Sequence, residues 1–145
     1  MKKAIIFLSI TLAVCAAPLA VPAQEQRAVE LTASGDTLSN ADTTYHTLTN
    51  IGYYDLIRVS YGVNKVNGTV AGTAQLQGCS DPDGVRWFNI DTVLTFQNQA
   101  VNQQTTLINP SSWRHLRVRY YTSGTVTAVA KSDAVLTRSN TVKKE

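Results

Sequence analysis

Two arginines near the C-terminal end carry the clearest binding chemistry in this sequence. Arg117 and Arg119 alternate with apolar residues, so in a strand they share one face with His115 and Tyr121. The guanidinium group offers a planar fork of donors that suits carboxylates, phosphates and acidic polysaccharides. We therefore take these four residues as candidate partner-binding residues. The alternative is an ordinary solvated strand face, partly paired with neighbours such as Asp133.

Carboxylates in one short segment form a second candidate site. Asp81 and Asp83 lie at alternate positions, and Asp91 follows them along the chain. They offer the hard oxygen ligands that calcium prefers, but calcium takes about six or more such ligands and few are present here. The favoured alternative is a turn in which the aspartates bond to their own backbone and Gly84 adopts a positive φ angle.

The sequence contains no arrangement typical of catalysis. His46 and His115 lie on separate predicted strands, and no serine, cysteine or carboxylate stands at the spacing of a nucleophilic triad. The glycines fall in strands and turns and form no phosphate-binding loop before a helix. We therefore predict that the protein is not an enzyme and uses no cofactor, and that both histidines are solvated.

Several aromatic residues are able to stack on sugar rings, which makes a surface glycan one class of partner. They are Tyr53, Tyr54, Trp87, Trp113 and Tyr121. In a domain of this size we expect at least one tryptophan in the core, with Trp87 as one candidate. The residues are compatible with an exposed platform but do not by themselves indicate one.

The first 23 residues have the layout of an export signal. Lys2 and Lys3 give a positive start, residues 4–17 form an apolar run, and residues 21–23 provide a small-residue cleavage context. Cleavage there leaves Gln24 as the new N-terminus. The sequence thus predicts export to the periplasm, the cell surface or the extracellular space.

Two other interpretations of this segment compete with cleavage. A retained membrane anchor would use residues 4–23, which are barely long enough to span a bilayer and contain Pro18 and Pro22. A lipoprotein site would use Cys15, but the bulky Val14 stands where a small residue is usual. Membrane contact is therefore expected only through an uncleaved N-terminus.

Charge, cysteine count and length describe the remaining chain. Lys2 and Lys3 account for two of the three net positive charges, so the rest is close to neutral and we predict no nucleic-acid partner. Cys79 is the only cysteine outside the signal; we expect it to be buried, with pairing between chains as the alternative. Residues 24–138 fit one domain, and residues 139–145 form a flexible polar tail.

Apolar and polar residues alternate almost throughout the chain, which predicts strands. Residues 53–63 follow this pattern, and Asn67-Gly68 then predicts a tight type I′ turn and a hairpin with the next alternating segment. The residues expected to point inward in the two arms are Ile57, Val59, Tyr61, Val63, Val70, Ala74 and Leu76.

A further hairpin is predicted near the C-terminus. Residues 115–121 and 125–137 both alternate, and Ser123-Gly124 between them is a turn signal. Their inward rows are Leu116, Val118 and Tyr120, then Val126, Ala128, Ala130, Ala134 and Leu136. The remaining expected elements are a turn at residues 80–84 and strands at 28–33, 45–49, 85–91, 93–96 and 105–108.

Together these elements predict an all-β fold, an antiparallel β-sandwich of jelly-roll-like form, because each strand must bury one face against a second sheet. A small barrel is the alternative. The only helix expected is that of the N-terminal signal peptide. Open sheet edges would allow self-association or pairing with a protein partner.

The central part of the chain resembles a family of small proteins encoded by phages and prophages of Bacteroidota. Residues 65–78, followed by residues 83–87, resemble their core pattern K-V-S-G-T-V-A-G-T-V-x-L-Q-G-S-x-D-G-x-N-W. Residues 113–125 are similar to their Y-L-Y-Y-R-V-x-x-x-G-S-G-T hairpin. The likeness covers most of residues 36–138 and implies a virion accessory role, as a decoration or fibre-like protein, with no catalytic residue.

A second likeness is to discoidin-type carbohydrate-binding modules. Residues 83–87 and the later residues 116–118 are similar to their S-x-D-G-x-x-W hairpin and R-Y-V-R strand. Residues 79–82 depart from the family pattern, so no sugar-contacting residue is transferred. We predict a non-enzymatic module for structure or attachment at a surface, foremost a virion accessory protein, with an exported carbohydrate-binding module as the alternative.

Overall fold

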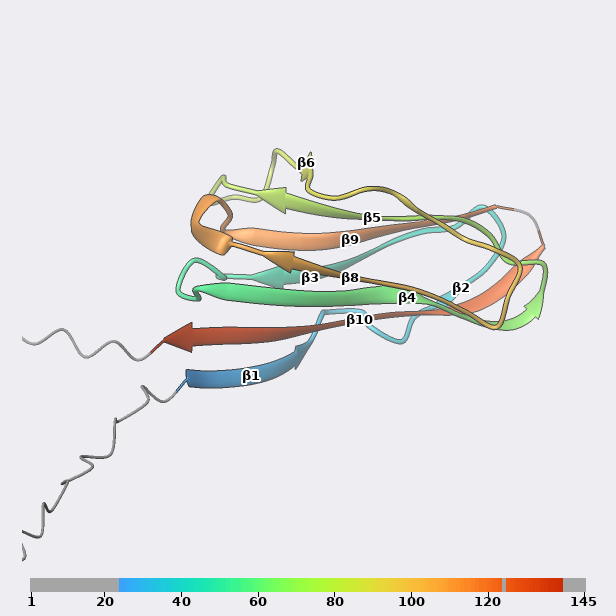
Figure 1. The fold of residues 1–145 in the computed structure, drawn as a ribbon. Helices are drawn as coiled ribbons and strands as arrows, with labels where there is room; N and C mark the ends of the chain where they lie inside the picture. Colours follow the sequence, from blue (N-terminus) through green and yellow to red (C-terminus); the bar gives the residue numbers. More distant parts are fainter. Residues whose placement is uncertain (1–23, 124, 140–145) are drawn as a thin grey trace, which may run out of the picture.

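The computed structural model describes residues 24–123 and 125–139. The predicted signal peptide, and all of the predicted tail after Ser139, lie outside these residues. Within them the chain forms ten strands and one short 3₁₀ helix, η1 (Pro110–Ser112). The strands make two antiparallel sheets packed face to face (Figure 1), which confirms the predicted all-β sandwich.

The first sheet is named the β4 sheet after its long central strand. Its strand order is β1-β10-β4-β8, and the short β2 also pairs with β10. The bounds are β1 (Gln24–Glu30), β2 (Thr37–Leu38), β4 (Leu56–Gly68), β8 (Val101–Ile108) and β10 (Val126–Ser139).

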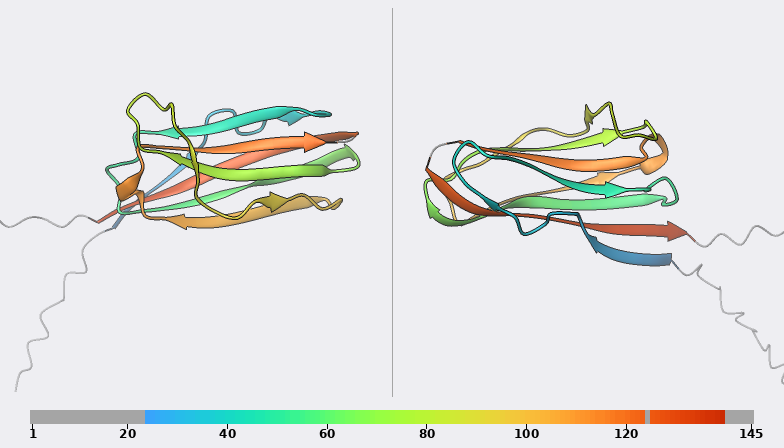
Figure 2. Two further views of the ribbon diagram at one scale, coloured as in Figure 1. Left: turned by 90° about the horizontal axis from the view of Figure 1, so that it is seen from above. Right: turned by 180° about the vertical axis from the view of Figure 1, so that it is seen from behind.

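The second sheet is named the β9 sheet. Its order is β3-β9-β5-β6, and the short β7 also pairs with β5. The bounds are β3 (Thr43–Thr49), β5 (Ala71–Cys79), β6 (Phe88–Asn89), β7 (Leu94–Thr95) and β9 (His115–Ser123). The left view of Figure 2 looks down on this sheet and shows β3, β9 and β5 side by side.

Both predicted hairpins are wrong, because the two arms of each lie in different sheets. β4 pairs with β8 and β10, whereas the next strand, β5, pairs with β9; β9 and β10 are divided between the sheets in the same way. Gly68 has a φ of 75°, but Asn67 does not adopt the positive φ that a type I′ turn requires. Alternation identifies the buried face of a strand and does not identify the strand that lies beside it.

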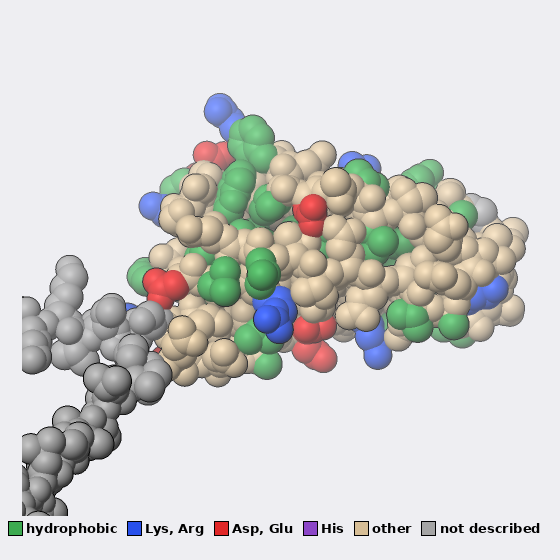
Figure 3. Space-filling view, in the orientation of Figure 1, with side chains coloured by type: hydrophobic (Ala, Val, Ile, Leu, Met, Phe, Trp, Pro, Cys, Tyr) green, Lys and Arg blue, Asp and Glu red, His purple; other side chains and the backbone are tan. Residues whose placement is uncertain are grey.

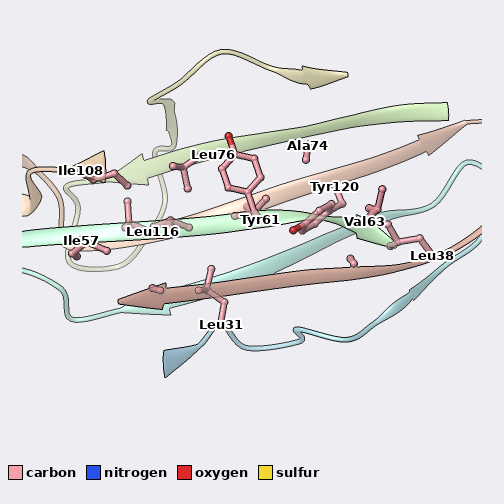
Figure 4. Packing of buried hydrophobic residues seen from close by; sticks show 14 of the residues in the cluster. Leu31, Leu38, Ile57, Tyr61, Val63, Ala74, Leu76, Ile108, Leu116 and Tyr120 are labelled. Carbon is pink, nitrogen blue, oxygen red and sulfur yellow. The ribbon is translucent and has the colours of Figure 1, made fainter. Parts of the chain in front are cut away.

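One apolar core fills the space between the sheets. Figure 4 shows Tyr61 of β4 and Tyr120 of β9 within it, near Leu76 and Leu116. The residues predicted to point inward are buried wherever their side chains are described: Ile57, Val59, Tyr61, Val63, Val70, Ala74, Leu76, Leu116, Val118, Tyr120, Ala128, Ala130, Ala134 and Leu136. Cys79 is buried too, as predicted.

His46 is completely buried, which corrects the prediction that it is solvated. Its Nδ1 lies 3.0 Å from Oγ of Ser132 on β10, and that hydroxyl lies 2.7 Å from the hydroxyl of Tyr120. The Tyr120 oxygen also accepts the backbone N–H of Gly62 at 3.1 Å. This polar chain joins the two sheets through the core. The burial of His46 could not be predicted from the sequence, because β3 carries polar residues on both faces and so does not show which face is buried.

Candidate binding face

The outward side of the β9 sheet brings the candidate arginines together with side chains from two other strands. Two cross-strand rows define it: Tyr45, Arg119 and Gln75 in one, and Thr47, Arg117 and Gln77 in the next. Tyr121 and Thr73 adjoin the first row, and His115 adjoins the second. These positions together with Trp87 are called the arginine face below.

Arg117 is fixed in place by three neighbours. Its guanidinium carbon lies 4.6 Å from the centre of the Tyr45 ring and 4.2 Å from that of Trp87, so it is held between two aromatic faces. Its Nε donates a hydrogen bond to Oε1 of Gln77 at 2.8 Å. Burial, and to a smaller extent the charge of Arg119, lowers the pKa of Arg117 from its usual range. Arg117 therefore organises the face.

Trp87 reaches the face from the loop after β5. Its indole N–H donates to the carbonyl of Gly84 at 2.7 Å, and the carboxylate of Asp81 accepts the backbone N–H of Arg86 at 3.2 Å. Gly84 has a φ of 66°, which confirms the predicted turn. Trp87 is thus a surface residue, and the tryptophan that packs against the core, partly buried, is Trp113.

A hollow of about 210 Å³ lies beside Arg119. Its lining consists of Thr73, Gln75, Gln77, Asn89, Val93, Arg119 and Tyr121. Gln77 Nε2 donates to Asn89 Oδ1 at 2.8 Å, and Gln75 Nε2 donates to the carbonyl of Asp91 at 2.6 Å. The Oε1 atom of Gln75 is buried and, among the described residues, has no hydrogen-bond donor. The hollow is therefore lined with amides that the protein itself satisfies only in part.

The arginine face has positive charge and no acidic partner. Strands β3, β5 and β9 contain no aspartate or glutamate. Arg119 is exposed, and the described part of the chain gives its guanidinium no ion pair or hydrogen bond. The expected pairing with Asp133 is wrong, because Asp133 lies on β10 in the other sheet. On the side of the molecule shown in Figure 3, charged side chains are instead scattered.

The four predicted partner-binding residues all lie on this face, but their surroundings differ. Tyr121 is 41% exposed at the end that carries the hollow. His115 lies at the opposite end of the strand, where its Nε2 is 3.1 Å from the carbonyl oxygen of Pro82. Arg119 and Tyr121 are therefore free to meet a ligand, whereas His115 and Arg117 contact the protein itself.

The aspartates considered for calcium belong to separate hydrogen-bond networks. Asp81 supports the turn before Trp87, while the carboxylate of Asp91 accepts hydrogen bonds from Gln104 and Thr106 of β8. The bond from Thr106, above all, lowers the pKa of Asp91 from its usual value. Residues 24–123 and 125–139 contain no group of three or more His, Cys, Asp or Glu that could hold a metal ion.

Sequence reasoning missed the half of the arginine face that comes from β3 and β5, namely Tyr45, Thr47, Thr73, Gln75 and Gln77. Each of the strands β3 and β5 shows outward polar or aromatic residues at alternate positions, which was the available signal. That signal does not reveal that both strands flank β9. The pairing depends on contacts across the sheet, which no local pattern records.

A wider hollow of about 460 Å³ lies at one end of the sandwich. Its lining includes Tyr53, Trp113 and Arg114, with backbone and small side chains from the neighbouring loops. It lies apart from the arginine face, with which it shares no lining residue. It is the natural comparison site for any binding experiment.

Comparison with protein-family models and with curated proteins gives no match to this chain. The resemblances to phage proteins and discoidin-type modules therefore stay predictions. Within the described residues no helix is long and apolar enough to cross a membrane.

Solved structures share the fold. The chain is similar to a protein of infectious bursal disease virus strain Gx, with a TM-score of 0.53 and 10% identity over 82% of this chain and 33% of that one. For the VP2 subviral particle of infectious bursal disease virus the TM-score is 0.51 and the identity 12%, over 79% of this chain and 33% of that one. For a xylan-binding domain of Paenibacillus barcinonensis Xyn10C the TM-score is 0.45 and the identity 6%, over 77% of this chain and 94% of that one. The chain thus spans about a third of the viral proteins and shares their β-sandwich fold.

Proposed function

We propose that the protein is a non-enzymatic attachment module of jelly-roll form that binds a surface glycan on the arginine face. The observation that carries this proposal is one hollow lined by the exposed Tyr121 ring, several amides and the Arg119 guanidinium, next to the Tyr45 and Trp87 rings that contact Arg117. Glycan sites combine an aromatic face for the sugar ring with a few convergent polar groups, and the arginine face provides both.

The jelly-roll assignment rests on the path of the chain. Strands β3, β4, β5, β8, β9 and β10 alternate between the two sheets. Two Greek keys wound together give this alternation, which also occurs in viral and lectin domains. The fold supplies a rigid platform of three long strands, and the loop after β5 adds Trp87 to it.

Two settings suit an attachment module of this kind. The resemblance to proteins of Bacteroidota phages favours a virion accessory protein, in which the face would hold the particle to a host glycan. The predicted export signal favours a secreted or surface-bound module, because virion parts assembled in the cytoplasm need no export. The glycan-binding face serves either setting, and we place the virion role first.

The proposal is tested with a panel of immobilised neutral and acidic glycans and the purified protein. Tyr121→Ala is expected to weaken binding by about 2- to 10-fold, because it removes an aromatic contact worth about 0.5–1.5 kcal/mol. Tyr53→Ala is the matched control, since Tyr53 is 77% exposed but lies at the other hollow. Binding that survives Tyr121→Ala and is lost in Tyr53→Ala would overturn the assignment of the face.

A further inference from the structure

We infer that the glycan is an acidic polysaccharide, and that one of its charged sugar units occupies the hollow beside Arg119. This inference rests on the proposed function, because it concerns the same face. It adds the chemical class of the ligand and the residue that selects it.

The charge distribution favours an anionic ligand. Arg117 and Arg119 alternate on one strand and so lie about 7 Å apart on the same side. The Nε of Arg117 donates to Gln77 and its guanidinium lies over the Tyr45 and Trp87 rings, whereas the guanidinium of Arg119 has no hydrogen bond or ion pair among the described residues. Asp91 is the acidic residue closest in sequence to the lining, and its carboxylate is engaged by β8. An acid group of the ligand in the hollow therefore meets the guanidinium of Arg119, with the positive charge of Arg117 nearby on the same strand, and no aspartate or glutamate of these strands neutralises either charge.

The lining of the hollow favours a sugar over an acidic peptide. Gln75, Gln77 and Asn89 present amides, Thr73 presents a hydroxyl, and the ring of Tyr121 forms a wall. The Oε1 of Gln75 is buried and has no donor among the described residues, and a small turn of the side chain toward the hollow would let it accept a sugar hydroxyl. With a volume of about 210 Å³, the hollow is smaller than the roughly 300–1,000 Å³ of sites for drug-sized ligands, so it suits one unit of a polymer.

Arg119→Gln tests the inference directly, with Arg114→Gln as its control. Each variant removes one exposed arginine charge beside one of the two hollows. The probes are polygalacturonate, its fully methyl-esterified form and dextran sulfate, measured by isothermal titration calorimetry at two salt concentrations. We expect the wild type to bind polygalacturonate at least about tenfold more tightly than its neutral ester, with the difference shrinking at high salt.

The variants then assign the residue. Arg119→Gln is expected to reduce the affinity for the acidic polymer by about tenfold. The unfolding midpoint should not shift, because the Arg119 side chain has no hydrogen bond or ion pair among the described residues to lose. Arg119→Lys should restore part of the affinity, since it keeps the charge but not the planar fork. Arg114→Gln should bind as the wild type does. Stronger binding to dextran sulfate than to polygalacturonate, if Arg119→Gln weakens it and Arg114→Gln does not, would support the same site and identify a sulfate ester as the charged group.

Several results would overturn the inference. If the neutral ester binds as tightly as polygalacturonate and only Tyr121→Ala reduces binding, the acidic class is wrong while the proposed function stands. If no polysaccharide binds, both fail. If Arg114→Gln reduces binding and Arg119→Gln does not, the site is the other hollow. If polyglutamate binds as well as polygalacturonate, the face recognises charge alone and the sugar assignment is wrong.

Discussion

At the scale of single residues, the two outward arginines of β9 have different roles because their neighbours differ. Arg117 lies between Tyr45 and Trp87 and donates to Gln77, so its charge also stabilises the packing of the loop on the sheet. Arg119, two residues along the same strand, has no such contacts and is available to a ligand. The residue type alone did not separate these roles; the positions of the neighbouring rings did.

His46 makes stability depend on pH. Its burial lowers the pKa of the imidazole below the ordinary value of 6.5, with the charge of Asp36 opposing part of the effect. The unfolded chain then binds more protons than the folded one below about pH 6.5, so the free energy of unfolding falls as the pH is lowered through this range. Above about pH 6.5 the imidazole is neutral in both the folded and the unfolded chain, so His46 no longer reduces the free energy of unfolding.

Urea unfolding at a series of pH values from neutral to mildly acidic checks this prediction. The wild type should lose stability toward the acid end, and His46→Gln, which cannot titrate, should show a flatter curve. His115→Gln serves as the control variant, because it removes the other imidazole of the chain from a position outside the core. Equal slopes for the wild type and His46→Gln would contradict the account.

At the scale of elements, the close pairing of β5 with β9 requires a glycine. Gly72 has a φ of 132°, and a Cβ at this position would collide with the carbonyl oxygen of Tyr121. We expect Gly72→Ala to reduce the free energy of unfolding by at least about 2 kcal/mol, because strained backbone and steric conflict add together. The measurement is a urea denaturation curve.

Gly52→Ala provides the comparison for this change. A Cβ at Gly52 meets no atom within 4 Å, and its φ is not positive. Its effect should stay within about 0.5 kcal/mol, as for other surface substitutions. Equal stability losses in both variants would show that the pairing at Gly72 is looser than described.

The strands also show which features of the fold could be predicted from the sequence. Alternation predicted which side of β4, β5, β9 and β10 is buried, because the burial of one face is a local property of each strand. Turn residues suggested hairpins at Asn67-Gly68 and Ser123-Gly124 that the chain does not form. In a sandwich of this kind consecutive strands cross between sheets, and the crossing depends on the whole core.

At the scale of the whole molecule, the binding face is assembled from segments far apart in the sequence. Its residues come from β3, β5, β9 and the loop that carries Trp87. The segment that follows this loop is held to β8 of the other sheet by the hydrogen bond between Asp91 and Thr106. The candidate residues His115, Arg117, Arg119 and Tyr121 came from one strand and were predictable from its pattern. Tyr45, Gln75 and Asn89 were not, because only the tertiary arrangement brings them alongside.

The central claim, that this face holds an acidic glycan, is tested most directly by nuclear magnetic resonance. An isotope-labelled sample is titrated with an oligogalacturonate, and backbone amide shifts are followed residue by residue. The account predicts that the largest changes occur around Tyr45, Gln75, Arg119 and Tyr121. Changes centred on the hollow around Trp113, or the absence of changes at the arginine face, would contradict it.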